Sequence, residues 1–176
     1  MDTALAALIL ITVLFFGALT FSETYFHVQE TLLVATQERE TRTETRARTA
    51  LTLVGIETQN AGTMIEITLR NTGTTKLADF DQWDVLIQYY TAADIYVTDW
   101  FPYVAGPELE ENQWTVQQIY GSAADGTPEV YAPGILNPTE ELVIQVQVAP
   151  GVGANTTNLA TIVASNGVSL SAVFVP

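Results

Sequence analysis

Residues 3–22 read TALAALILITVLFFGALTFS, and this uncharged stretch decides the architecture of the chain. Twenty residues of α-helix rise about 30 Å, which matches the hydrocarbon core of a bilayer. A helix in the core of a soluble protein rarely stays apolar on every side over such a length, because one side usually faces water. The stretch is therefore predicted to be a helix enclosed either by lipid or by copies of itself.

A cleaved secretory signal peptide is the competing interpretation of this stretch. Such a peptide has a basic segment before the apolar run and a small-residue cleavage site after it. Here the chain starts Met1-Asp2, the first base is Arg39, and the run continues into SETYFHVQE. These features favour a helix that is retained. Whether a leader precedes Met1 stays open.

The helix is predicted to continue to about residue 47. No Pro occurs before Pro102, and Gly17 is the only early Gly. Apolar side chains then recur at three- and four-residue spacing (Tyr25, Val28, Leu32 and Ala35), as on one side of a helix. Acids also stand four residues ahead of bases, as Glu38 does of Arg42, which supports a helix about 70 Å long. The Thr-rich alternation ETRTETRART also fits an exposed strand, so this alternative stays open.

The all-round apolar part of this helix carries the candidate functional residues. If such helices leave a membrane together, hydrophobic burial at about 25 cal/mol per Å² holds them to one another. The segment can thus act first as a membrane anchor and then as the core of a polymer. The predicted polymerisation core consists of Leu5, Leu8, Ile9, Val13, Phe16, Leu19 and Tyr25.

From Leu51 onward the hydrophobic period changes to two, which is typical of half-buried strands. In TMIEITLRNTG the apolar Ile65, Ile67 and Leu69 alternate with polar residues. Further strands are predicted at residues 83–90, 95–101, 114–120 and 141–148, with a final hairpin around Asn166-Gly167. Seven to nine short strands predict an antiparallel, immunoglobulin-like β-sandwich.

The predicted fold class is therefore α+β, with a helix over residues 1–48 and a β-sandwich domain over residues 49–176. Trp83, Trp100 and Trp114 all lie in the second part and are predicted to fill the core between the sheets, with carbohydrate binding as the alternative. Residues 104–133 are rich in Gly, Pro and acids and are predicted to form exposed loops around one strand.

The second part of the chain is strongly acidic. From Thr49 onward fourteen acids face only Arg70 and Lys76, within a whole-chain net charge of −14. A surface of this sign is repelled by nucleic acid, which excludes that class of partner. An acidic surface that keeps an exposed domain soluble is the simplest explanation.

Nothing in the sequence predicts a catalytic, cofactor or metal site. The chain has no Cys, and its one His, His27, borders the apolar run. Two groups of acids (Asp79, Asp81 and Asp84; Glu108, Glu110 and Glu111) could attract Ca²⁺, but neither has the spacing of an EF-hand loop, and solvated loops are expected. Asn155-Thr156-Thr157 is the one acceptor sequence for N-glycosylation, in the Gly- and Asn-rich link PGVGANTTN.

This layout resembles the archaellins, the subunits of the archaeal rotary swimming filament and relatives of type IV pilins. LAALILITVLFFGALTF is similar to the archaellin core helix, and LNPTEELVIQVQV is similar to a Pro-then-acid approach to a late strand in such domains. The resemblance implies an extracellular motility filament of many identical copies, with helices at the axis and β-domains outside. It also implies insertion in a membrane before assembly, a prepilin-type peptidase and an assembly ATPase with its platform.

The chain departs from the family pattern at two positions. Bacterial-type pilins usually carry Glu where this chain has Leu5, although archaellins often lack that Glu, and Met1 is an unusual first residue for a processed subunit. Two alternatives therefore stay open. One is a stator-like archaellum accessory protein with a membrane helix and an immunoglobulin-like domain, and the other is a minor pilin or membrane-anchored binding module.

Overall fold

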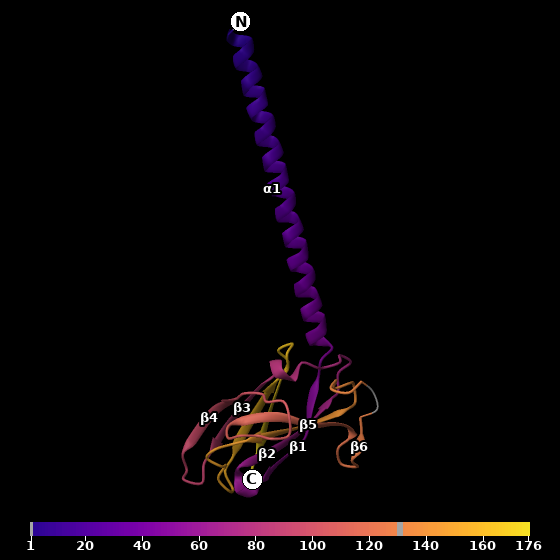
Figure 1. Cartoon of the computed structure of the whole chain (residues 1–176), viewed down its shortest axis with the longest axis vertical. Helices are drawn as coiled ribbons and strands as arrows, with labels where there is room; N and C mark the ends of the chain where they lie inside the picture. Colours follow the sequence, from indigo (N-terminus) through magenta and orange to yellow (C-terminus); the bar gives the residue numbers. More distant parts are fainter. Residues whose placement is uncertain (1, 130–131) are drawn as a thin grey trace. The chain divides into compact units, whose positions relative to one another are not determined.

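The computed structural model describes residues 2–129 and 132–176 (Figure 1). The chain divides into two compact units, the first ending at Glu44 and the second running from Thr45 to Pro176. Within these residues, one long helix is followed by nine strands and two short 3-10 turns. The elements are α1 (Asp2–Ala47), β1 (Leu51–Gln59), η1 (Asn60–Gly62), β2 (Met64–Asn71), η2 (Phe80–Gln82), β3 (Asp84–Tyr90), β4 (Tyr96–Phe101), β5 (Gln113–Ser122), β6 (Thr127–Pro128), β7 (Glu141–Gln147), β8 (Asn158–Val163) and β9 (Ser169–Phe174).

The predicted continuous helix is confirmed, because α1 runs without a break over 46 residues. The strand alternative for ETRTETRART is wrong over most of its length. Threonine is tolerated in α1 because its hydroxyl bonds to the backbone one turn earlier: Thr12 Oγ1 donates to the Leu8 carbonyl at 2.8 Å and Thr24 Oγ1 to that of Thr20 at 2.9 Å. The polar groups of these side chains are therefore satisfied within the helix.

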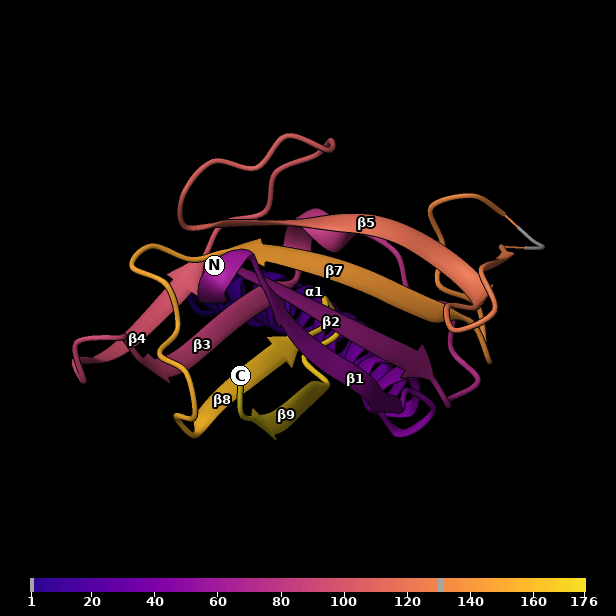
Figure 2. The same ribbon diagram turned by 90° about the horizontal axis from the view of Figure 1, so that it is seen from below.

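The predicted antiparallel sandwich is also confirmed. One sheet has the strand order β1-β2-β7-β5-β6 and the other has the order β4-β3-β8-β9, with every pair of named strands antiparallel. Figure 2 shows the two sheets from below, with β5, β7, β2 and β1 in one and β4, β3, β8 and β9 in the other. Ile65, Ile67 and Leu69 of β2 are fully buried, as their alternation predicts.

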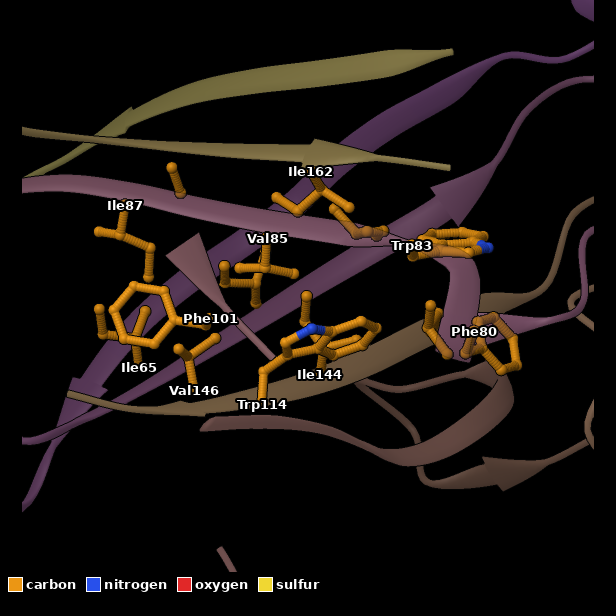
Figure 3. Close-up of a cluster of buried hydrophobic side chains, with 14 of the residues drawn as sticks. Ile65, Phe80, Trp83, Val85, Ile87, Phe101, Trp114, Ile144, Val146 and Ile162 are labelled. Carbon is orange, nitrogen blue, oxygen red and sulfur yellow. The ribbon is translucent and has the colours of Figure 1, made fainter. Parts of the chain in front are cut away.

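The core between the sheets is made of aromatic and aliphatic side chains (Figure 3). Trp83 and Trp114 lie in it, as predicted, and the Trp83 indole donates to the Ala78 carbonyl at 3.0 Å. The prediction for Trp100 is wrong, since 56% of this side chain is exposed. The next residue, Phe101, points inward, and a strand turns successive side chains to opposite faces.

Two strands, β1 and β6, were not resolved by the sequence pattern. The register of β1 shifts between Leu53 and Gly55, and this bulge interrupts the alternation that would reveal a strand. Strand β6 has only two residues, too few to show a period. The final hairpin is as predicted, with Gly167 at φ 79° in its turn and the Ala164 amide bonded to the Val168 carbonyl at 2.9 Å.

Candidate functional site

The apolar surface of α1 is the candidate site. It is the one candidate membrane span found among the described residues, by length and composition, with a mean hydropathy of 2.6 over its most apolar window and none of that window buried. All seven residues of the predicted polymerisation core are exposed, with exposed fractions between 48% for Leu19 and 65% for Val13. Such a surface is stable only when lipid or other apolar side chains cover it.

The geometry of α1 brings six of the seven predicted residues together. At 3.6 residues per turn, Leu5, Leu8, Ile9, Val13, Phe16 and Leu19 fall within an arc of about 140°, whereas Tyr25 lies on the opposite side. The remaining arc is equally apolar and exposed, as Leu10, Ile11 and Leu14 show. The helix can therefore be covered from all directions, as several neighbouring helices or lipid chains would do.

The one His lies on an exposed part of α1. Glu23, Phe26, His27 and Glu30 line a shallow depression there, all contributed by the same helix. This arrangement provides two carboxylates and an imidazole but no nucleophile, so it does not support acyl-transfer chemistry. Across residues 2–129 and 132–176, no three His, Cys, Asp or Glu side chains are grouped as metal ligands.

A second hollow lies on the β1-β2-β7-β5-β6 sheet. It encloses about 370 Å³ and is lined in part by Glu57, Glu66 and Tyr120. Glu66 is already engaged, because its Oε2 accepts from the Gln145 amide at 3.2 Å. We assign no reaction to this hollow.

Asn155 lies in an exposed turn just before β8. Its backbone has φ 60°, and Thr156 Oγ1 holds the turn by donating to the Gly153 carbonyl at 2.6 Å. Thr157, the third residue of the acceptor sequence, is exposed as well. The turn thus presents both required side chains to solvent, and glycosylation of Asn155 stays a prediction.

Sequence reasoning missed a group of buried acids near the start of β7. Glu141 is 1% exposed, and its carboxylate accepts from the Arg70 guanidinium and from the Ala123 amide at 2.6 Å. Glu140 Oε2 accepts from the Asn137 backbone amide at 2.8 Å and from its side chain at 3.0 Å. The sequence Asn137-Pro138-Thr139-Glu140 was the available signal, because Asn three residues ahead of Glu favours such a local turn.

Within the same group, Glu129 Oε1 and Glu140 Oε1 are buried without a hydrogen-bond partner among the described residues. Burial raises the pKa of Glu129, and the neighbouring Glu140 carboxylate raises it further, against two backbone hydrogen bonds that lower it. The hydrogen bonds of Glu140 and Glu141 hold the segment before β7 in place.

No protein-family model and no curated protein sequence matches the chain. Solved structures do match. The archaeal flagellum of Methanospirillum hungatei strain JF1 matches with a TM-score of 0.57 at 15% identity, over 97% of this chain and 90% of that one. The archaellum periplasmic stator protein FlaG from Sulfolobus acidocaldarius matches with a TM-score of 0.51 at 17% identity, over 72% of this chain and 99% of FlaG. A complex of FlaF and FlaG from the same organism matches over 70% of this chain, with a TM-score of 0.50 at 17% identity.

The three likenesses show the fold. The two stator matches cover 72% and 70% of the chain, a share that residues 49–176 alone can account for. The flagellum match covers 97% of the chain and therefore includes the helix as well. The layout predicted from the resemblance to archaellins, a long apolar helix followed by a β-sandwich, is therefore shared with a known archaeal filament.

Proposed function

We propose that this chain is the structural subunit of an archaellum- or type IV pilus-like surface filament that serves motility. The observation that carries the proposal is the first half of α1, which is apolar on all sides and exposed in the described chain. The match to an archaeal flagellum over 97% of the chain supports it, because that match includes the helix. The proposal involves no catalytic step.

Burial of the helix supplies the energy of assembly. Covering about twenty apolar residues removes on the order of 2,000 Å² from water, a gross gain of tens of kcal/mol before the entropy of association is subtracted. The hydroxyls of Thr12 and Thr20, within the apolar part, donate to carbonyls of their own helix, so burying these two side chains leaves neither hydroxyl unsatisfied. The predicted core, from Leu5 to Tyr25, would line these contacts.

Because lipid and other copies can each cover the apolar surface of α1, we infer two successive stages, membrane insertion and then assembly. The subunit first spans a membrane through α1, and it then leaves the lipid when α1 packs against other copies. A prepilin-type peptidase and an assembly ATPase with its platform are the partners proposed by resemblance, and the β-sandwich of residues 49–176 would form the extracellular wall. Glycans on Asn155, where added, would project from an exposed turn.

A stator-like accessory protein is the second candidate, and one observation favours it. FlaG matches over 99% of its own length, so the matched part of this chain has the fold of nearly the whole stator protein. In this alternative α1 stays in the membrane. The two candidates differ in location, since a filament subunit is abundant in sheared surface fractions and an anchored accessory protein remains with the membrane.

Substitution of Val13 tests the proposed polymer core. Val13→Asp puts a charge into the apolar arc, and a charged group buried without a partner is strongly unfavourable. We expect loss of filaments, seen by electron microscopy of sheared fractions, while the β-sandwich keeps its thermal unfolding midpoint. Ala124→Asp, which adds the same charge to an exposed loop of the β-sandwich, should assemble normally. Normal filaments from Val13→Asp would refute an axial helix core.

A further inference from the structure

The outer face of the β4-β3-β8-β9 sheet carries almost no charge. The strand register places every second residue on this face, beginning with Asp84 on β3, Tyr96 on β4, Leu159 on β8 and Ser169 on β9. Of the thirteen residues so placed, all within the described chain, only Asp84 is charged. We refer to these outward residues as the neutral face. The acids of the domain therefore lie elsewhere.

The other sheet provides an internal comparison. Its outer face carries Glu57 directly opposite Glu66, and Arg70 opposite Glu141. An antiparallel sheet with one face to solvent normally has polar residues on that side, as this sheet does. The neutral face departs from the pattern although both sheets belong to one strongly acidic domain. A surface without charges in such a protein indicates contact with something other than water.

The aromatic side chains of the neutral face are held in place before any partner arrives. Trp100 is 56% exposed, yet its indole donates to Asp84 Oδ1 at 2.8 Å. This bond also gives the one charged side chain of the neutral face a hydrogen-bond partner. The Tyr96 hydroxyl donates to Gln88 Oε1 at 3.0 Å, and the ring centroids of Tyr96 and Tyr90 lie 5.0 Å apart. Exposed aromatic residues are typical of protein interfaces, and ordered ones lose little entropy on binding.

We propose that the neutral face packs against the β-sandwich of a second copy of this chain, an inference that rests on the proposed filament. Two copies that each carry a net charge of −14 repel one another over most of their surfaces. They meet at least cost where charge is absent, and the neutral face is such a place. A basic partner would gain nothing there and would be drawn to the acidic surfaces instead.

The size of the neutral face explains why the contact depends on the filament. Four strands about 4.8 Å apart and about six residues long cover on the order of 300 Å², well below the roughly 800 Å² per partner of a stable complex. Such a face does not hold a dimer alone. It becomes effective when α1 keeps the copies close together, because tethering raises their effective concentration.

The test places the same charge on the two sheets of the full-length protein. Thr98→Glu adds a carboxylate to the neutral face, and Thr52→Glu adds one to the outer face of the other sheet, opposite Arg70. Both threonines are exposed strand residues. We expect Thr98→Glu filaments to release at least about tenfold more unassembled subunit at equilibrium, because like charges in a contact cost several kcal/mol. Thr52→Glu should match the wild type.

Two further measurements separate a lost contact from a damaged fold. The unfolding midpoint of the detergent-solubilised subunit should be the same in both variants and the wild type. High salt should restore much of the Thr98→Glu assembly, since it screens repulsion between charges. Trp100→Ser, which removes aromatic area without adding charge, should also release more subunit, with no rescue by salt.

Other outcomes overturn the inference in distinguishable ways. If wild type, Thr98→Glu and Thr52→Glu release equal amounts of subunit, the neutral face is not a contact, although the filament itself stands. If assembly is unchanged but the wild type is retained by cellulose, amylose or mannan in affinity electrophoresis and Trp100→Ser is not, the face binds neutral carbohydrate. If the wild-type chain forms no filaments, the proposed function fails and the inference fails with it.

Discussion

At the scale of single residues, the buried hydroxyl of Tyr89 is the clearest cost in the core. It has no hydrogen-bond partner among the described residues, and burial, with a further effect of Asp99, raises its pKa. A buried polar group without a partner is unfavourable by about 1–3 kcal/mol. We predict that Tyr89→Phe raises the free energy of unfolding by about 1 kcal/mol, measured by chemical denaturation of the detergent-solubilised chain. If Tyr89→Phe instead lowers the free energy of unfolding by a similar amount, the hydroxyl has a partner, such as a bound water molecule.

Glu129 makes stability depend on pH. Its pKa is raised in the folded state by burial and then by Glu140, so ionisation of this carboxyl opposes folding. The favourable protonated state is fully populated below the ordinary pKa of Glu and is lost as the pH rises through the raised value. We predict that Glu129→Gln raises the unfolding midpoint at neutral pH and that this gain disappears in acid. Glu108→Gln, in an exposed loop, is the control. An equal rise in the unfolding midpoint at neutral and acidic pH would show that ionisation of Glu129 does not cause the pH dependence.

Most elements could be predicted from the sequence because each has one dominant period. The all-round apolar run predicted α1, and strict alternation predicted β2, where every second residue is buried. The exceptions have physical causes. A bulge hides the alternation of β1, and Trp100 belongs to an edge strand that carries aromatic residues on both faces, so that hydrophobicity did not reveal its direction.

The candidate site could be predicted only in part. An apolar helix surface is readable from composition, whereas the neutral face requires the register of four strands that are far apart in the chain. The buried group around Glu140 was missed because an acidic residue is expected at the surface and only the fold brings Glu129 close to it.

At the scale of elements, Gly73 closes the connection after β2. Its amide donates to the Ala50 carbonyl at 3.1 Å, and a Cβ at this position would lie 2.5 Å from the Ala50 nitrogen and the Arg48 oxygen. Both are backbone atoms, so the chain itself would have to shift to relieve the overlap. We predict that Gly73→Ala lowers the free energy of unfolding by about 1–3 kcal/mol. Gly55→Ala, where a Cβ meets nothing within 4 Å, should be neutral, and equal effects of the two changes would contradict this explanation.

At the scale of the whole molecule, the β-sandwich has a core of its own. Among the described residues, all of the buried hydrophobic ones, from Leu51 to Phe174, belong to the unit that starts at Thr45. We predict that trypsin cleavage after Arg42 releases a soluble fragment with the unfolding midpoint of the intact subunit, followed by calorimetry and mass spectrometry. A fragment that unfolds or aggregates on release would show that the first unit is needed for folding.

The proposed filament has α1 at its axis. An electron cryomicroscopy reconstruction of sheared surface filaments, at a resolution that separates helices, would show this arrangement. We expect helices packed together at the axis through the arc that contains Leu8, Val13 and Phe16, with the β-sandwiches as the outer wall. Filaments that lack this chain, together with recovery of the chain only from membranes, would contradict it.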